Sequence, residues 1–277
     1  MIKLIATDLD NTLLDARGTI PESTAALLRQ VGEQGVRTAV ATGRCYPSAL
    51  AAARAIGAQT PIICYNGSLI RQGDTGETLA RHLIGPEDIL PLSDYCHREG
   101  LYLQLYGPDD TLVIEEMCDG ARLDPDLPVV GFREVGDFRR CADLQPTPKM
   151  LIVEQPEQVS ARLKDLGARF SRLSFSQSQP WLIEVMPLGA DKGRALERLA
   201  SLLGLDRSQV MALGDNTNDL PMIRWAGCGV AVGNSAAALK AEADYVCAAQ
   251  RSLGVEEALR KFVLYRQKPR TLRGGKP

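Results

Sequence analysis

The feature of this sequence that most constrains its fold is an alternation of short apolar runs with helix-like segments, which stops near residue 84 and resumes after residue 187. Runs that are apolar on both faces are typical of strands inside a parallel sheet, and their alternation with helices indicates βαβ units. The early strands are expected at 2–7, 36–42 and 61–65, with helices at 21–34 and 47–57. The later strands are expected at 209–215, 228–233 and 244–247, with helices at 191–203, from about 218, at 236–241 and at 255–264.

The segment between these two parts has a different pattern. Its apolar runs are short, partly alternating and separated by Pro and Gly, as in an antiparallel sheet covered by helices. They lie at 101–106, 111–116, 149–154, 169–176 and 181–187, with helices expected after Pro86 and at 156–167. We therefore predict an α/β protein with a parallel-sheet core (residues 1–83 and 188–264), an inserted α+β domain (84–187) and a basic tail (265–277) that is expected to be disordered.

The composition argues against several classes of function. A net charge of −2 gives no basic footprint for nucleic acid, and 5% aromatic residues give no stacking platform for bases. The seven cysteines are scattered without a C-x-x-C pair, which disfavours a zinc site or a disulfide framework and favours reduced thiols in a cytoplasmic protein. No apolar stretch is long enough to span a membrane. We expect a monomer or a homodimer that acts on a small molecule.

Acidic side chains follow two of the expected core strands. Asp8 and Asp10 end the first strand, and Asp215 and Asp219 follow the strand at 209–215. Either pair, taken alone, has the alternative interpretation of a turn or helix cap, since Asp often serves as one. In an open α/β sheet, however, the carboxyl ends of the strands share the edge where ligands bind, and clustered carboxylates there need a cation. Oxygen ligands at this density predict Mg²⁺, which readily shares its coordination shell with a phosphate.

Other strand and helix ends supply groups that suit a phosphate. Thr42 offers a hydroxyl, and Gly43 lets a backbone N–H approach an oxyanion at the start of a helix. Lys192 opens a helix, where the dipole disfavours a cation; its alternative interpretation is a solvated surface lysine. Neither a P-loop nor a G-x-S-x-G motif is present, so the nucleophile is sought among the carboxylates. Asp8 would attack phosphorus, and Asp10 would protonate the leaving oxygen and then activate a water.

Four short motifs follow one another along the chain: DLDNT (8–12), ATGR (41–44), DKG (191–193) and GDNTND (214–219). They resemble the four motifs of the haloacid dehalogenase superfamily. The insertion between the second and third motifs, with the strings CYNGSLI (64–70) and GVAVGNSAAALKAEADYV (229–246), resembles its Cof-like branch of sugar-phosphate phosphatases, which carry a class IIB cap. The resemblance implies a Rossmann-like core, a large cap, and Mg²⁺-dependent hydrolysis of a small phosphorylated metabolite, such as a sugar phosphate, through an aspartyl-phosphate.

The resemblance also implies roles for individual residues. Asp8 is the expected nucleophile and a metal ligand, and Asp10 is the expected general acid and base, with its backbone carbonyl as a ligand. Asp215 is the expected carboxylate ligand of the fourth motif, with Asp219 beside it as a ligand or a support. The expected phosphoryl-binding residues are Thr42, Gly43, Lys192 and Asn218.

Substrate contacts are less well marked in the sequence. Arg44 and Asn66, near the phosphate loop, are candidates, as are Glu184 and Trp181 on the inserted domain, although Trp181 is more simply a core aromatic. After DYV the chain has CAAQRSLGVEEAL (247–259) in place of the polar stretch of the Cof-like pattern, so the resemblance does not extend to a leaving-group contact from that loop. A phosphomutase and a non-enzymatic phosphate-binding module on the same fold are the alternative functions.

Overall fold

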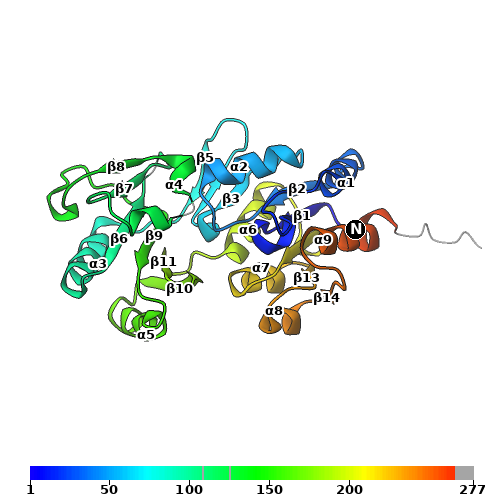
Figure 1. Ribbon diagram of the computed structural model, residues 1–277. Helices are drawn as coiled ribbons and strands as arrows, with labels where there is room; N and C mark the ends of the chain where they lie inside the picture. Colours follow the sequence, from blue (N-terminus) through cyan, green and yellow to red (C-terminus); the bar gives the residue numbers. More distant parts are fainter. Residues whose placement is uncertain (108, 125, 266–277) are drawn as a thin grey trace, which may run out of the picture.

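The structure is a computed structural model that describes residues 1–107, 109–124 and 126–265, and it consists of two lobes that lie side by side (Figure 1). Apart from Tyr265, the tail expected at 265–277 lies outside the described residues. Within the described ranges, none of the helices combines the length and the apolar character that crossing a membrane requires.

The first lobe contains a five-stranded parallel sheet of order β14-β13-β12-β1-β2. Its strands are β1 (Leu4–Thr7), β2 (Arg37–Val40), β12 (Val210–Gly214), β13 (Cys228–Ala231) and β14 (Tyr245–Val246). β1 lies between β12 and β2. The acidic segment after β1, with Asp8 and Asp10, therefore begins in the middle of the sheet, next to the acidic segment that follows β12. This arrangement is the predicted parallel-sheet core.

Helices cover both faces of this sheet because β1 is apolar on both sides. Leu4 and Ala6 pack on one face and Ile5 on the other. The first face is covered by α6 (Lys192–Leu202), α7 (Leu220–Trp225) and α8 (Ala237–Glu242), and the second by α1 (Glu22–Glu33), α2 (Tyr46–Ala55) and α9 (Arg251–Leu259). α9 begins at Arg251, four residues before the expected start, and continues as a π-helical turn, Arg260–Leu264.

The apolar run at 61–65 was expected to be a full strand of the parallel sheet, but it is not one of the five strands of that sheet. It pairs with the residue that follows β2 through an isolated parallel bridge, between Ala41 and Ile63. The chain then turns back into a three-stranded antiparallel sheet, which was not expected from the sequence. Its strands are β3 (Ile62–Cys64), β4 (Leu69–Arg71) and β5 (Thr78–Arg81).

The second lobe is a six-stranded sheet of order β10-β11-β9-β6-β7-β8, antiparallel except for the pair β7 and β8. Its strands are β6 (Tyr102–Tyr106), β7 (Leu112–Ile114), β8 (Phe132–Glu134), β9 (Met150–Val153), β10 (Leu173–Gln179) and β11 (Leu182–Pro187). Its helices are α3 (Pro86–Glu99), α4 (Leu127–Val130) and α5 (Val159–Arg169). The sequence did not predict β8 or α4, both of which are short and largely exposed.

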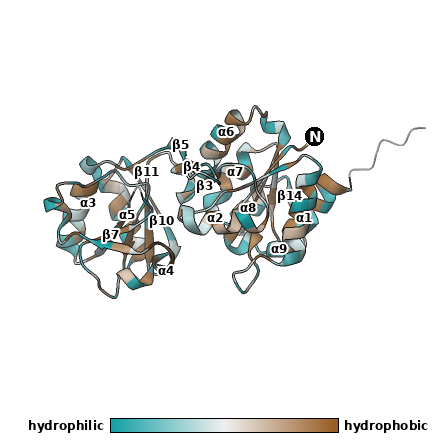
Figure 2. Ribbon diagram, turned by 90° about the horizontal axis from the view of Figure 1, so that it is seen from above, coloured by the Kyte–Doolittle hydropathy of each residue, from teal (hydrophilic) through white to brown (hydrophobic). Residues whose placement is uncertain are grey.

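One face of the second sheet is apolar and packs on α3 and α5, with Leu103, Ile152 and Ile183 in a common core. The alternate residues Tyr106, Leu151 and Glu184 lie on the other face and line a cavity shared with the first lobe. The second lobe therefore presents an uncovered sheet face to the edge where β1 and β12 end, and we call this lobe the cap. Figure 2, seen from above, also shows two distinct lobes, and the cap lies next to the end of the core that contains β3 and α2.

Buried polar contacts fix the cap on the core. The carboxylate of Asp110 accepts hydrogen bonds from the Tyr65 hydroxyl at 2.8 Å and from Arg71 at 2.5 Å. The carboxylate of Asp126 accepts from the backbone N–H of Cys45 at 3.3 Å and from the Ser48 hydroxyl at 3.1 Å, at the start of α2. These carboxylates replace solvent at the junction and orient the open sheet face over the core.

Candidate active site

A cavity of about 540 Å³ separates the carboxyl edge of the core sheet from the open face of the cap sheet. Seven of the predicted site residues line it: Asp8, Asp10, Gly43, Arg44, Asn66, Asp215 and Asn218. Three further predicted residues, Thr42, Lys192 and Asp219, are fully buried directly behind this lining. The structure thus brings these ten residues to one place, at the sheet edge where ligands of open α/β sheets bind. Of the two candidates on the inserted domain, Glu184 lines the same cavity and Trp181 does not.

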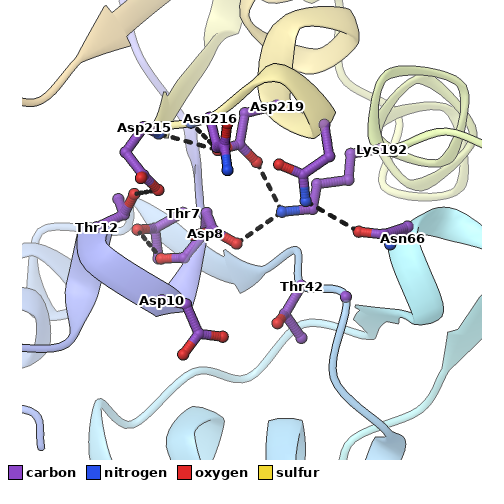
Figure 3. Close-up of polar contacts among 12 residues, drawn as sticks. Thr7, Asp8, Asp10, Thr12, Thr42, Asn66, Lys192, Asp215, Asn216 and Asp219 are labelled. Carbon is purple, nitrogen blue, oxygen red and sulfur yellow. Dashed lines mark hydrogen bonds and ion pairs between the residues drawn. The ribbon is translucent and has the colours of Figure 1, made fainter. Parts of the chain in front are cut away.

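Lys192 is a fully buried cation shared by two carboxylates. Its Nζ donates to Asp8 Oδ1 and to Asp219 Oδ1, each at 2.6 Å. Figure 3 marks both contacts with dashed lines. Burial disfavours the charged ammonium, but Asp219 and Asp8 together hold the pKa of Lys192 above its usual value. The interpretation of Lys192 as a solvated surface lysine is therefore wrong.

The buried group of three carboxylates, Asp8, Asp215 and Asp219, contains more negative charge than Lys192 can neutralise. One oxygen from each carboxylate can be chosen so that all three lie within 4.8 Å of one another. Burial raises the pKa of Asp8 to about 8 despite the nearby ammonium, and burial together with the charge of Asp219 raises the pKa of Asp215 to about 6. A cluster in this state favours either extra protons or a cation.

The loop after β12 folds so that Asp219 supports this group from behind. Asp219 Oδ2 accepts hydrogen bonds from the backbone N–H groups of Asp215 at 2.9 Å and Asn216 at 3.1 Å. The close approach requires glycine at 214, because a Cβ there would lie 2.5 Å from the Cβ of Asp219. On the other side, the Thr12 hydroxyl donates to Asp215 Oδ1 at 3.0 Å. Thr12 was not singled out from the sequence, although it lies within the DLDNT motif.

Asp10 lies apart from the lysine-centred group. Its carboxylate is about half exposed, at 52%, and is bound by Arg44 through Nε at 2.9 Å and Nη2 at 2.6 Å. Figure 3 shows the carboxylate of Asp10 turned away from Lys192. The strand ends before this point, and Asn11 takes a left-handed conformation with φ of 58°, so the chain reverses and separates Asp10 from Asp8. In the structure, Arg44 thus contacts a protein carboxylate.

Thr42, Gly43 and Asn66 form a second wall of the site. The Thr42 hydroxyl accepts from the backbone N–H of Arg44 at 3.2 Å. A Cβ on Gly43 would lie 2.9 Å from Asn66 Oδ1, so glycine leaves room for this amide. Asn218 Nδ2 donates to the same Oδ1 at 3.1 Å, so this amide links the turn at Asn66 to the loop that follows β12. Tyr65 and Asn66 both have positive φ, near 50°, which marks local strain at this turn.

The cap adds an ion pair that was not predicted as such. Lys149 Nζ donates to Glu184 Oε1 at 2.8 Å and to the backbone carbonyl of Gly43 at 3.3 Å. Glu184 Oε2 accepts from Asn66 Nδ2 at 2.7 Å. Glu184 was a candidate for substrate contact and does border the site, whereas Lys149 was not singled out from the sequence. The signal that could have identified Lys149 is a lysine placed directly before the apolar run MLIV.

The donor set fits a hard divalent cation. Asp8 and Asp215 offer carboxylate oxygens to the cavity, and three carboxylates against one ammonium leave a net negative charge. Mg²⁺ takes oxygen ligands of this kind and keeps several waters that a phosphate can replace. Together with a carboxylate nucleophile candidate and a buried lysine, this arrangement can bind a phosphoryl group and attack it.

Comparison with known proteins agrees with this chemistry. The family model described as haloacid dehalogenase-like hydrolase matches residues 5–259. A 5-amino-6-(5-phospho-D-ribitylamino)uracil phosphatase of Bacillus subtilis strain 168, YitU, is 28% identical over 94% of this chain and 97% of its own length.

Solved structures share the complete architecture. A haloacid dehalogenase-like hydrolase from Bacteroides thetaiotaomicron superposes with a TM-score of 0.84 and 29% identity, covering 94% of this chain and 99% of that one. The subclass IIB sugar phosphatase BT4131 has a TM-score of 0.78 at 22% identity, over 94% of this chain and 98% of its own, and shares the fold. Both the core and the cap are included in these matches.

Proposed function

The chain belongs to the haloacid dehalogenase-like hydrolases with a subclass IIB cap and is a phosphatase of that family, and from this premise we propose that it hydrolyses phosphate monoesters of small metabolites with Mg²⁺ through an aspartyl-phosphate on Asp8. The observation that carries the proposal is the buried ammonium of Lys192, shared by Asp8 and Asp219 inside a three-carboxylate cluster. A cluster of this kind is costly to maintain in a fold unless it binds something.

Asp8 and Asp215, and the backbone carbonyl of Asp10, would hold the Mg²⁺ ion, with Asp219 beside them. When bound, the ion would offset the charge that builds up between the carboxylate and the phosphoryl oxygens. Asp219 already accepts from Lys192 and from two backbone N–H groups. Its main contribution would therefore be to orient Lys192 and the Asp215 loop.

In the first step, a carboxylate oxygen of Asp8 would attack phosphorus, and the bond between phosphorus and the ester oxygen would break. Lys192 would hold the negative charge of the transferring phosphoryl group, together with Thr42 and the backbone N–H of Gly43. Asp10, in its protonated form, would give its proton to the leaving oxygen, so that the alcohol departs neutral. Asp8 then carries the phosphoryl group.

In the second step, Asp10, now ionised, would take a proton from a water whose oxygen attacks the phosphorus. The bond from Asp8 to phosphorus would break, which releases inorganic phosphate and restores both aspartates. Arg44 would orient the ionised carboxylate of Asp10 in this second step, because it binds both oxygens.

The substrate would be small, because the cavity of about 540 Å³ is closed on one side by the cap. We propose that residues 84–187 act as this cap, with 1–83 and 188–264 as the catalytic core. A sugar phosphate or a similar polar ester fits the polar lining. The cytoplasmic location expected from the sequence stays a prediction, as does the oligomeric state.

The experiment that tests this function is a panel of phosphorylated metabolites and aryl phosphates, assayed for phosphate release with Mg²⁺ and with excess chelator. We expect release from at least one ester that depends on Mg²⁺ and returns when Mg²⁺ is added back. Turnover that persists in chelator would contradict the metal dependence. No turnover of any ester with Mg²⁺ present would contradict the proposed reaction.

A further inference from the structure

Lys149 is a buried cation of the cap for which the proposed phosphoryl transfer has no task. Its side chain is 6% exposed, directly before β9. Its Nζ bonds the carboxylate of Glu184 on the cap and the carbonyl of Gly43 on the core. Lys149 is thus placed where the cap meets the loop that is proposed to hold the phosphoryl group.

The ammonium of Lys149 has three N–H groups but only two hydrogen-bond acceptors among the residues that the structure describes. A lysine ammonium carries three N–H groups, and two acceptors lie within hydrogen-bond distance, Glu184 Oε1 and the Gly43 carbonyl. Buried donors normally have partners, and Lys149 lines the cavity. One N–H therefore remains for a molecule bound there.

The position of this lysine is fixed from both sides. Glu184 Oε2 accepts from Asn66, whose own Oδ1 accepts from Asn218, so the acceptor of Lys149 is itself tied to the core. The Lys149 ammonium also lies 5.3 Å from the centre of the Tyr106 ring. A group held in this way is preorganised to bind at one point, with little conformational entropy left to lose.

A phosphoryl group at Asp8 and Gly43 directs the rest of the substrate toward the cap, because the core closes the opposite side. The first part of the leaving group then lies beside the Gly43 carbonyl and Lys149. We propose that Lys149 is a specificity-determining residue, which donates a hydrogen bond to an oxygen of the leaving group close to the phosphoester. This proposal rests on the proposed phosphatase function.

The charges around Lys149 favour a neutral oxygen, such as a hydroxyl, over a second anion. Glu184 neutralises the positive charge of Lys149, and Asp124 and Asp126 add further carboxylates to the lining of the same cavity. A carboxylate or a second phosphate on the leaving group would meet this excess of negative charge. The ester selected would therefore carry a hydroxyl on a carbon near the ester oxygen.

The test compares glycerol 3-phosphate with n-propyl phosphate, which has the same charge and chain length but no hydroxyls. In the wild type, we expect kcat/KM to favour glycerol 3-phosphate by about 10- to 100-fold, the range for one hydrogen bond to a charged group. Lys149→Met should reduce this ratio to near 1, and Lys149→Arg should keep part of it. Lys164→Met, at an exposed position of α5, is the matched control and should keep the wild-type ratio.

Several results would overturn the proposal. Equal losses on both esters in Lys149→Met would mean that the lysine only links cap and core, and no wild-type preference between the esters would remove the selectivity itself. A Lys149-dependent preference for 2-phosphoglycolate over glycerol 3-phosphate would contradict the neutral acceptor. If circular dichroism shows that Lys149→Met does not fold, Lys149→Arg takes its place in the test. A kcat/KM ratio between the two esters that equals the wild-type ratio in Lys149→Arg would then overturn the proposal. Failure of the wild type on every ester would instead refute the phosphatase function on which the proposal rests.

Discussion

Asp10 and Arg44 form an ion pair with two parallel hydrogen bonds at the rim of the cavity, Nε to Oδ2 at 2.9 Å and Nη2 to Oδ1 at 2.6 Å. From the sequence alone, the two residues receive separate tasks, one as acid and base and the other as a substrate contact. Their pairing makes the orientation of the Asp10 carboxylate depend on the Arg44 guanidinium, because a planar fork fixes both oxygens at once.

Replacing Arg44 tests this dependence. Arg44→Lys keeps the charge but cannot bind both oxygens, so we expect kcat for p-nitrophenyl phosphate to fall about 10- to 100-fold while KM changes by less than about threefold. Steady-state kinetics measure both parameters, and Arg54→Lys, at an exposed position of α2, the helix that begins two residues after Arg44, is the control. A large rise in KM with kcat unchanged would instead show that Arg44 binds the substrate directly.

The meeting of Asp8 with Asp215 was predictable, because the ends of neighbouring parallel strands must share an edge. The burial of Lys192 was not predictable from local pattern, since a lysine at the start of a helix looks the same whether it is solvated or buried. Its partners, Asp8 and Asp219, are 184 and 27 residues away in the chain. Its unusual place at the start of a helix suggested a function, and the resemblance to known motifs gave it a role, but neither identified these partners.

The cap was harder to predict than the core. In an antiparallel sheet, the cross-strand neighbours depend on register, which the apolar pattern of one strand does not fix. Glu184 faces the cavity because β11 pairs it with Leu151 of β9, which places it near Lys149. β8 and α4 are largely exposed, so they lack the apolar periodicity by which the other elements were found. The hairpin of β4 and β5 turns at Gly76, with φ of 72°, a turn signal that was overlooked.

Asp8→Asn should abolish hydrolysis without harming the fold. A neutral amide is a poor nucleophile, so we expect kcat for p-nitrophenyl phosphate to fall by at least about 1,000-fold. Lys192 keeps Asp219 as a partner, and one acidic group is removed from a crowded cluster. The melting temperature without metal should therefore not fall. Substantial turnover in a preparation free of wild-type enzyme would contradict the assignment of Asp8 as the nucleophile.

Lys192→Met should destabilise the core as well as stop catalysis, because it leaves the two carboxylates of Asp8 and Asp219 buried without a cation. Losing one partner of a buried ion pair typically costs about 3–5 kcal/mol in the free energy of unfolding. Urea denaturation without metal measures this loss.

The double variant Lys192→Met with Asp219→Asn separates the two effects of the lysine. It should recover part of the stability, since one unpaired buried charge is removed, but it should recover no activity. A double variant as unstable as the single one would show that the loss comes from packing and not from charge.

The raised pKa values of Asp8, about 8, and Asp215, about 6, predict that the metal-free protein becomes less stable as pH rises. An acid whose pKa is higher in the folded state binds more protons when folded, so its contribution to stability is complete below the unfolded pKa near 4 and is lost as pH rises through 6 to 8. Mg²⁺ competes with these protons, so its stabilising effect should grow over the same range. Urea denaturation at pH 5.5 and 8, with Mg²⁺ and with chelator, measures both trends. Asp215→Asn should weaken both of them relative to the wild type, whereas an identical pH dependence in the variant would mean that Asp215 does not titrate in this window.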